Sequence, residues 1–431
     1  MGAAAGLGAT GLARPVRALS PDTNAGIAAR IDAAVDRAVA DADFSGALML
    51  KRGDEVVYQR AVGQAERVFG AMNRIDTRFN VASIGKMFTA TAILRLAGEG
   101  KIRLDAPILR YLPDYPARDI AGQITTRQLL SHSSGIGNYW EAIAEKPSQA
   151  FVETRDFLPL FADQPLEFTP GERIGYSNGG YVILGLIVEA VTGEAFADHV
   201  RRTIFEPLGM SGSGDWPLDL VTPNRADGYT RDEAVPGAWR SNVFVNQFRG
   251  NPGGGGYSTV ENLSTFIAAL GDGRLLSPEM RVVATTGLFD MGRVRYGLGF
   301  EEDVVNGHRI LGHTGGHFGI AGEVWRYEDL GVTFAMLTNG EVDGYWSMNV
   351  AVKDILCGPS PATDAWRLGM AMTAAARDDS VAAARALFNA RPEGIQPRSV
   401  FEVEAAKARH RGNPEGAERI MQIAALVEPP A

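Results

Sequence analysis

Ser83 and Lys86 are the two residues whose types and spacing first suggest chemistry. On a helix, residues three apart share one face, so the hydroxyl and the amine would lie one turn from each other. A helix that starts near Ser83 would place the hydroxyl at its partly positive end, where developing negative charge is stabilised. Lysine can accept the hydroxyl proton, whereas arginine stays protonated. The pair indicates a nucleophile with a proton partner, but both residue types are common on surfaces, so partner motifs must decide.

Two later motifs supply such partners: Tyr176-Ser177-Asn178 and His313-Thr314-Gly315-Gly316. A tyrosine can share with a lysine the transfer of the proton to and from the attacking hydroxyl. An unperturbed phenol has a pKa of about 10, which is too high for a base at neutral pH. We expect a nearby Lys86 ammonium to favour the phenolate of Tyr176. Backbone N–H groups at Ser83 and near Gly316 are candidates for binding an oxyanion.

Further segments stand around these motifs in a fixed order. The chain resembles the serine β-lactamase-like hydrolases of the class C β-lactamase and D,D-peptidase type, which include family VIII carboxylesterases and D-aminopeptidases. The resemblance covers about residues 25–357. It rests on residues 79–86 (FNVASIGK), 129–135 (LLSHSSG), 170–171 (PG), 176–178 (YSN), 254–259 (GGGYST) and 313–315 (HTG).

The resemblance implies a role for each matching residue. The nucleophile that becomes acylated is Ser83, its proton partner is Lys86, and the general base is Tyr176. Four further positions are implied to bind substrate or the oxyanion: Asn178 orients substrate and lysine, His313 lines a strand edge beside the acyl group, and Gly315 and Gly316 belong to the oxyanion region. The resemblance implies no cofactor and no metal.

His313 departs from the β-lactamase pattern, in which the third motif usually carries a lysine. That lysine's charge helps to hold the carboxylate of a β-lactam, whereas a histidine with a pKa near 6.5 is mostly neutral at pH 7. We therefore expect a serine hydrolase that works through an acyl-enzyme, with short-chain esters as substrates of a carboxylesterase. A D,D-carboxypeptidase, a D-aminopeptidase or a weak β-lactamase remain alternatives, because some D,D-peptidases also have His-Thr-Gly. A catalytically inactive, penicillin-binding-like scaffold is the alternative of another class.

Two rival motifs overlap these residues. Residues 175–179 (GYSNG) match the Gly-x-Ser-x-Gly elbow of α/β-hydrolases, which would make Ser177 the nucleophile. The elbow requires a preceding strand, and the turn-like residues 169–173 disfavour one. His313 and His317 are four apart, as in a helical metal pair, but Gly315 and Gly316 between them disfavour a helix and a metal site. His132 and Trp140 are interpreted as packing residues, Trp140 also as a pocket wall.

Composition limits the partners. The 431 residues are 45% hydrophobic and carry a net charge of -9, which favours a globular hydrolase of small-molecule esters or amides over a nucleic-acid binder. We find no apolar stretch long enough for a membrane span, and the single cysteine, Cys357, excludes an internal disulfide. Residues 1–23 are interpreted as a disordered tail or the remnant of an export signal, which favours a periplasmic or secreted location over a cytoplasmic one.

The hydrophobic pattern predicts an α+β fold of one antiparallel sheet flanked by helices, with an inserted helical subdomain. A helix over residues 27–40 precedes a hairpin of strands 45–50 and 55–58. A nucleophile helix over residues 83–96 opens a mostly helical insertion of about residues 84–245. Strands are expected at residues 293–300, 308–311, 322–327 and 332–337, then a helix at 347–356. We divide the chain into residues 1–23, a hydrolase domain of residues 24–358 and a helical extension of residues 359–431.

Overall fold

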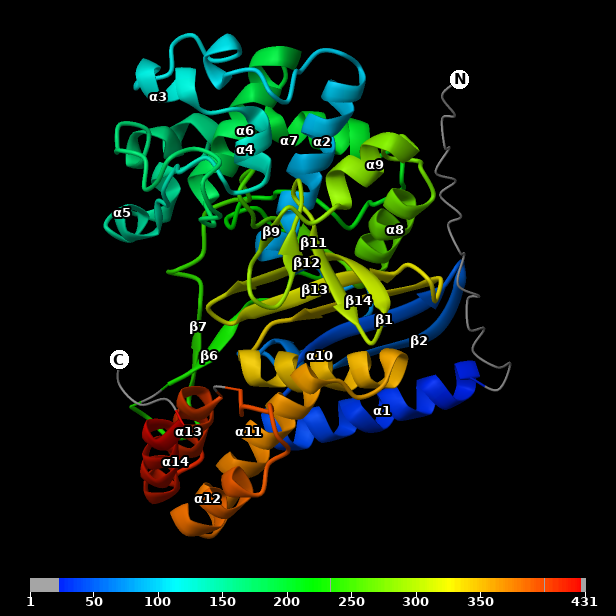
Figure 1. Cartoon of the computed structure of the whole chain (residues 1–431), viewed down its shortest axis with the longest axis vertical. Helices are drawn as coiled ribbons and strands as arrows, with labels where there is room; N and C mark the ends of the chain where they lie inside the picture. Colours follow the sequence, from blue (N-terminus) through cyan, green and yellow to red (C-terminus); the bar gives the residue numbers. More distant parts are fainter. Residues whose placement is uncertain (1–22, 233, 399, 428–431) are drawn as a thin grey trace, which may run out of the picture.

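A central eight-stranded antiparallel sheet organises the molecule (Figure 1). The computed structural model describes residues 23–232, 234–398 and 400–427, so the predicted tail lies almost wholly outside the described residues. The strand order is β2-β1-β14-β13-β12-β11-β10-β9. The strands are β1(Gly46–Arg52), β2(Glu55–Val62), β9(Phe289–Asp290), β10(Arg295–Tyr296), β11(Glu301–Val305), β12(His308–His317), β13(Ile320–Tyr327) and β14(Val332–Thr338).

Strands from early and late parts of the chain pair side by side in this sheet, as the sequence predicts. Strand β1 pairs with β2 on one side and with β14, almost 300 residues later, on the other; Gly46 lies opposite Thr338. A Cβ on Gly46 would come 2.2 Å from the Leu337 carbonyl oxygen, so glycine permits this close pairing. The α+β prediction is confirmed.

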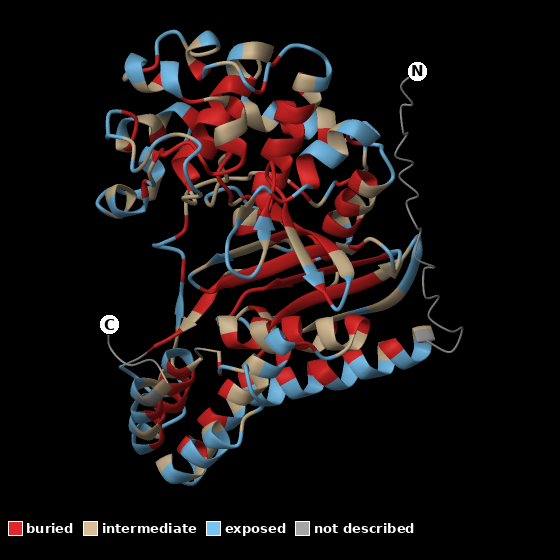
Figure 2. Cartoon of the chain, viewed as in Figure 1, coloured by how far each residue is buried: buried red, intermediate tan, exposed pale blue. Residues whose placement is uncertain are grey.

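Helices cover both faces of the sheet. Helices α1(Thr23–Ala42) and α10(Val342–Cys357) contact each other and share a hydrophobic cluster with β1, β13 and β14. On the opposite face, α8(Val260–Gly271) contacts β1, β13 and β14, and α2(Lys86–Gly98) and α6(Asn178–Thr192) belong to the larger cluster there. The strands between the two layers are largely buried (Figure 2). The sheet is therefore a rigid support for residues at its edges and on its helical face.

Helices are the main regular elements of the chain between Asn80 and Phe289, as predicted. The further helices of this region are α3(Arg118–Gln123), α4(Thr126–Leu130), α5(Trp140–Ala144), α7(Phe196–Val200) and α9(Pro278–Thr285), with shorter turns η1(Ala82–Gly85), η2(Ile108–Arg110), η3(Ser148–Ala150), η4(Thr154–Leu160) and η5(Arg201–Phe205). Three two-stranded pairs accompany the sheet: β3(Gln64–Glu66) with β4(Ala71–Met72), β5(Phe79–Asn80) with β8(Tyr257–Ser258), and β6(Tyr229–Arg231) with β7(Trp239–Ser241).

Several element boundaries differ from the predictions. The strand expected at residues 293–300 is only two residues long, and β11, which follows it, was missed. Strand β12 continues six residues beyond the predicted end at Leu311, because Gly312, Gly315 and Gly316 pair regularly with β13 instead of turning. Helix α1 begins four residues earlier than expected and α10 begins five residues earlier.

Helices α11(Pro361–Asp378), α12(Val381–Asn389), α13(Phe401–His410) and α14(Pro414–Val427) follow α10 and share a separate hydrophobic cluster. Helices α13 and α14 pack on each other across the predicted break at residues 412–414. Buried Lys407 on α13 lies 3.2 Å from Asp343 on α10, and Arg411 lies 3.1 Å from Asp43. We propose that residues 359–431 are an extension, whose described part has its own core and is attached through these ion pairs.

Among the described residues, no single helix combines the length and apolarity needed to cross a bilayer. Helix α6 and the segment Phe196–Phe205 reach those limits only as a pair bent by 77°.

Candidate active site

Ser83 lies on the short turn η1, directly before α2, rather than on the α-helix itself. Ala82 before it has φ +44°, a left-handed conformation that is costly for a residue with a Cβ. The Ala82 N–H donates to the Asn80 side-chain oxygen at 2.9 Å, which supports this bend. The turn presents Ser83 half-buried, whereas Lys86 begins the helix as a fully buried residue.

A glycine-rich loop, residues 253–256, holds this turn. The Gly255 N–H donates to the Ala82 carbonyl at 3.0 Å, and Gly256 accepts from the Val81 N–H at 3.1 Å. Gly254 has φ +144°, and a Cβ there would come 2.8 Å from the Ala82 oxygen. The sequence interpretation of this run as backbone that approaches the site closely agrees with these contacts.

Lys86 is buried among three oxygen atoms. Its Nζ lies 3.2 Å from the Ser83 Oγ and 2.6 Å from the Asn178 Oδ1, and it also donates to the Gly253 carbonyl. Burial lowers the pKa of Lys86 to about 7, although the charge of Glu301 opposes that change. The two carbonyl oxygens can each accept one N–H of a neutral amine. The lone pair of that amine then faces the Ser83 hydroxyl, so the geometry suits proton abstraction.

Tyr176 lies beside this pair, with its ring centre 4.8 Å from the Lys86 Nζ. Burial raises the pKa of Tyr176 well above the ordinary phenol value, and a hydrogen bond with Ser83 opposes the rise only in part. The expected lowering of the phenol pKa by Lys86 does not occur, because desolvation acts on both groups and favours their neutral forms. Lys86, not Tyr176, therefore has the pKa of a base at neutral pH.

His132 contributes to this arrangement, which the interpretation as a packing residue understated. It follows α4 with φ +55°, and its ring lies 4.2 Å from the ring of Tyr176, tilted by 36°. Its Nδ1 accepts the Ser177 N–H at 3.1 Å, and its carbonyl accepts the Gly175 N–H at 2.8 Å. Burial lowers its pKa well below the ordinary histidine value. A neutral His132 thus holds the backbone on either side of Tyr176.

Asn178 is the first residue of α6 and connects Lys86 to the wall of the site. Its N–H and its side-chain amide both donate to the Asn138 Oδ1, at 2.8 and 2.9 Å. Asn138 in turn donates to the Tyr176 carbonyl at 2.7 Å. These bonds fix the Asn178 amide so that its oxygen faces Lys86. No sequence motif indicated Asn138, since asparagine is common in loops.

Ser177 is explained by its structural bonds. Its Oγ accepts the Gly180 N–H at 2.8 Å, capping α6, and donates to the Gly137 carbonyl at 2.9 Å. Helix α6 follows it, but the last described element before it is the turn η4 and not a strand, and the central sheet is antiparallel. The α/β-hydrolase elbow therefore lacks the strand and the parallel sheet that it requires.

His313 is enclosed, with 1% of its surface exposed. Its Nε2 lies 3.0 Å from the Tyr296 hydroxyl, its Nδ1 faces the Thr314 carbonyl, and Glu301 lies 3.5 Å away. Burial lowers its pKa, with Glu301 opposing. The expectation that His313 lines the strand edge beside an acyl group is therefore not met by its side chain. The buried ring lies beside Tyr296, and it is neutral at pH 7.

Glu301 on β11 is a buried carboxylate that the sequence did not single out. It accepts the Thr314 N–H at 3.2 Å and the Thr314 hydroxyl at 2.9 Å. The missed strand β11 positions it, since Glu301 pairs with Gly312 across the sheet. The negative charge of Glu301 opposes the lowering of the Lys86 pKa by burial.

Gly315 and Gly316 bring β12 against the nucleophile turn. A Cβ on Gly315 would come 2.5 Å from the Val81 oxygen and 3.1 Å from the Ser83 nitrogen, so only glycine allows this contact. Gly316 and Ser83 line the same small pocket, of about 30 Å³. The structure thus brings together Ser83, Lys86, Tyr176, Asn178, Gly315 and Gly316. The buried side chain of His313 does not line the pocket beside Ser83.

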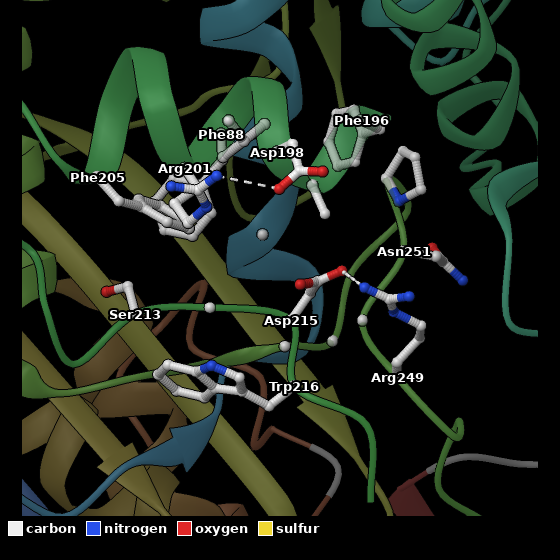
Figure 3. A pocket seen from close by; sticks show the side chains of 18 of the residues that line it. Phe88, Phe196, Asp198, Arg201, Phe205, Ser213, Asp215, Trp216, Arg249 and Asn251 are labelled. Atoms are coloured by element: carbon white, nitrogen blue, oxygen red, sulfur yellow. Dashed lines mark hydrogen bonds and ion pairs between the residues drawn. The ribbon is translucent and has the colours of Figure 1, made fainter. Parts of the chain in front are cut away.

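A much larger cavity, of about 690 Å³, is lined in part by Gly255 and Gly256 of the same glycine-rich loop (Figure 3). Phe88, Phe196 and Trp216 line it, and two ion pairs project into it: Asp198–Arg201 and Asp215–Arg249, at 3.1 and 2.8 Å. Ser83 and Lys86 do not line it. Size alone would place the site here, but the nucleophile and the buried lysine converge on the small pocket.

Comparison with known proteins places this site in a family. A family model described as Beta-lactamase matches residues 31–352. The chain belongs to the β-lactamase family. It is 37% identical over 207 residues to esterase EstB of Burkholderia gladioli, covering 44% of this chain and 52% of the esterase. It is 28% identical over 334 residues to penicillin-binding protein 4* of Bacillus subtilis, covering 73% of each.

A solved structure shows the same fold. The crystal structure of a penicillin-binding protein from Bacillus halodurans superposes with a TM-score of 0.68 and 27% identity, covering 74% of this chain and 99% of that one. The resemblance drawn from the motifs is thereby confirmed. The alignment with EstB spans only about half of that esterase.

Proposed function

We propose that this member of the β-lactamase family is a serine hydrolase that cleaves neutral carboxylic esters through an acyl-enzyme on Ser83. One observation carries the choice of substrate: the small pocket beside Ser83 has no lysine, arginine, aspartate or glutamate among its described lining residues. An ionic group on the substrate would lose water there without gaining a partner of opposite charge. A neutral ester avoids that cost, which supports a carboxylesterase over a peptidase that must hold a terminal carboxylate.

The buried base begins the proposed reaction. Neutral Lys86 takes the proton of the Ser83 hydroxyl as its oxygen attacks the ester carbonyl carbon. The carbonyl oxygen gains the negative charge, and we assign the N–H groups of Ser83 and Gly316 to its stabilisation. Asn178 and the Gly253 carbonyl hold the resulting ammonium through the two bonds they already make.

Tyr176 remains protonated and is proposed to act as the acid. Its hydroxyl donates a proton to the alkoxy oxygen as the bond between that oxygen and the carbonyl carbon breaks, and Lys86 returns a proton to the phenol. A water molecule then attacks the acyl-enzyme, Lys86 accepts its proton, and Ser83 leaves with a proton restored. This reverses the division of roles implied by the resemblance, because the pKa directions favour Lys86 as base.

Esterase EstB supports this reading by its name, as the relative with the highest identity described above. A D,D-carboxypeptidase, a D-aminopeptidase and a weak β-lactamase remain the alternatives. The neutral His313 also supports an uncharged substrate, because it does not supply the positive charge expected at the third motif of a β-lactamase. The complete set of Ser83, Lys86 and Tyr176 argues against an inactive scaffold.

A substrate panel tests the proposal. We expect kcat/KM for p-nitrophenyl acetate and butyrate to exceed that for a D-Ala-D-Ala peptide, a D-alanine anilide and nitrocefin by at least about a hundredfold, a difference of about 2.7 kcal/mol in transition-state binding. A peptide or nitrocefin value above the ester values would show that the ester assignment is wrong. The Ser83→Ala variant, measured beside each substrate, removes the contribution of uncatalysed hydrolysis.

A further inference from the structure

Large apolar side chains are exposed around the mouth of the small pocket. We call this group the apolar rim, and it comes from three separate segments. Phe244 is 95% exposed and Phe318 is 64% exposed, values far from those of core phenylalanines. The members of the rim are Trp140 on α5, Val243, Phe244 and Val245 in the loop after β7, and Phe318 in the turn between β12 and β13.

His317 joins these segments to one another. Trp140 stacks on its ring at 5.3 Å with an interplanar angle of 23°, and Phe318 meets it edge-on at 5.3 Å. The His317 Nε2 donates to the Val245 carbonyl at 2.9 Å. Asn242 donates to the Phe318 carbonyl at 2.7 Å, which ties the loop to the turn a second time. These contacts hold Trp140, His317 and Phe318 against one another and fix the backbone of the loop that carries Val243, Phe244 and Val245, so the rim is one contiguous surface.

The rim continues directly from the site. Trp140 and His317 line the same pocket as Ser83 and Gly316. That pocket offers about 30 Å³, whereas a cavity that accepts benzene has about 150 Å³. An aromatic ring therefore does not fit beside Ser83 and must lie outside, where the rim is. A small acyl group fits within.

The order of the proposed reaction decides which part of the substrate lies on the rim. The acyl group stays bonded to Ser83 after the first step, so it occupies the inner pocket. The alcohol leaves first and must point toward the open mouth. We propose that the apolar rim binds a flat aromatic alcohol portion of the ester, so that the substrates are small-acyl esters of aromatic alcohols. This assignment rests on the proposed esterase function.

Aromatic stacking and apolar burial give the expected size of the effect. We expect the loss of two aromatic contacts to lower affinity by about tenfold. Phe244 and Phe318 are suitable to change because both are largely exposed and support no core packing. Trp140 is less suitable, since its stacking on His317 also supports the pocket.

The test measures kcat/KM for 2-naphthyl acetate and for methyl acetate in the wild type and in the Phe244→Ser/Phe318→Ser double variant. The two esters share an acyl group, and comparing variant with wild type on each ester cancels their different reactivity. We expect the ratio of the naphthyl to the methyl value to fall about tenfold, mainly through KM. Val304→Ser is the control, since Val304 is 63% exposed but pairs with Arg309, at the opposite end of β12 from His317.

The outcomes separate the two levels of the proposal. Hydrolysis of both esters with an unchanged ratio in the double variant would overturn the rim assignment alone. Absence of Ser83-dependent hydrolysis of either ester would overturn the esterase function and the rim assignment with it. An equal fall of the ratio in Val304→Ser would show that the effect is not specific to the rim, and would also overturn the assignment.

Discussion

Two cavities are both lined by residues of the loop 253–256, and they differ in what they can do. The larger, of about 690 Å³, is walled by aromatic rings and paired charges (Figure 3). The smaller, of about 30 Å³, holds Ser83 and adjoins a lysine whose pKa burial lowers to about 7. Volume measures what a cavity can hold, whereas reactivity requires a nucleophile, a base of suitable pKa and oxyanion donors at one point.

The charged side chains at the two cavities also differ in the groups that surround them. In the large cavity, Arg201 and Arg249 each lie beside a carboxylate, so their charges are balanced. Beside the small one, Lys86 contacts neutral oxygens and has one more distant carboxylate, Glu301, nearby. A buried amine without a carboxylate in contact gives up its proton readily. Residues of one glycine-rich loop line both cavities.

Loss of the nucleophile is the largest change we expect. Ser83→Ala should lower esterase kcat by at least about a thousandfold, because acyl transfer has no other acceptor in the small pocket. Ser177→Ala is the matched control: it removes the cap of α6 and about 1 kcal/mol of stability, but leaves substantial activity. Chemical denaturation and kcat measured on both variants check this. Comparable losses of kcat in the two would contradict the assignment.

Lys86→Arg tests whether the amine moves a proton or only supplies charge. We expect kcat/KM to fall by about 10²–10⁴-fold, since a guanidinium keeps the charge but cannot accept the Ser83 proton. Circular dichroism at neutral pH establishes that the variant is folded. Near-normal turnover in a folded Lys86→Arg variant would mean that the base lies elsewhere.

The pH profile distinguishes Lys86 from Tyr176 as base. Because burial lowers the pKa of Lys86 to about 7, the active neutral amine is lost as pH falls through 7 and predominates above pH 8. The pH dependence of kcat/KM should therefore rise with an apparent pKa near 7 and then level off. Burial raises the pKa of Tyr176 well above 10, so a tyrosinate base would keep the rate rising through pH 9.

The smallest effect should come from the larger cavity. Ala197 lines this cavity and not the small one, and Ala197→Phe would fill part of the space. We expect kcat/KM on p-nitrophenyl acetate to stay within about twofold of wild type, since surrounding space accommodates the added ring. A tenfold change would show that the two cavities are coupled, for example through the loop that lines both.

The order of motifs made the reactive residues predictable, while the geometry around them was not. Ser83, Lys86, Tyr176 and Asn178 converge as their spacing suggested, because each belongs to a recognisable local pattern. Asn138 and Glu301 have no such pattern, and their importance comes from contacts with residues 38 or more and 13 positions away. His132 belongs to the segment 129–135, but that segment did not indicate its contact with Tyr176, 44 positions away. Tertiary contacts of that kind leave little trace in a single sequence.

The protonation states were the part that sequence reasoning misjudged. A lysine beside a tyrosine suggested a lowered phenol pKa. That expectation assumes that the attraction between the ammonium and the phenolate outweighs the effect of burial. The structure buries both groups, so desolvation dominates and favours the neutral phenol and the neutral amine. The prediction that the strand ends at Leu311 was also wrong. Glycines often indicate a turn, but the glycines of β12 allow the strand to pack closely against η1.

Covalent labelling tests the central claim most directly. The protein is incubated with a fluorophosphonate at pH 8, where Lys86 is mostly neutral, and the modified residue is located by peptide mass spectrometry. We predict one stoichiometric adduct on the peptide that contains Ser83, formed by the wild type and by Ser177→Ala and absent from Ser83→Ala. An adduct on Ser177, or no adduct in the wild type, would contradict an acyl-transfer site centred on Ser83 and Lys86.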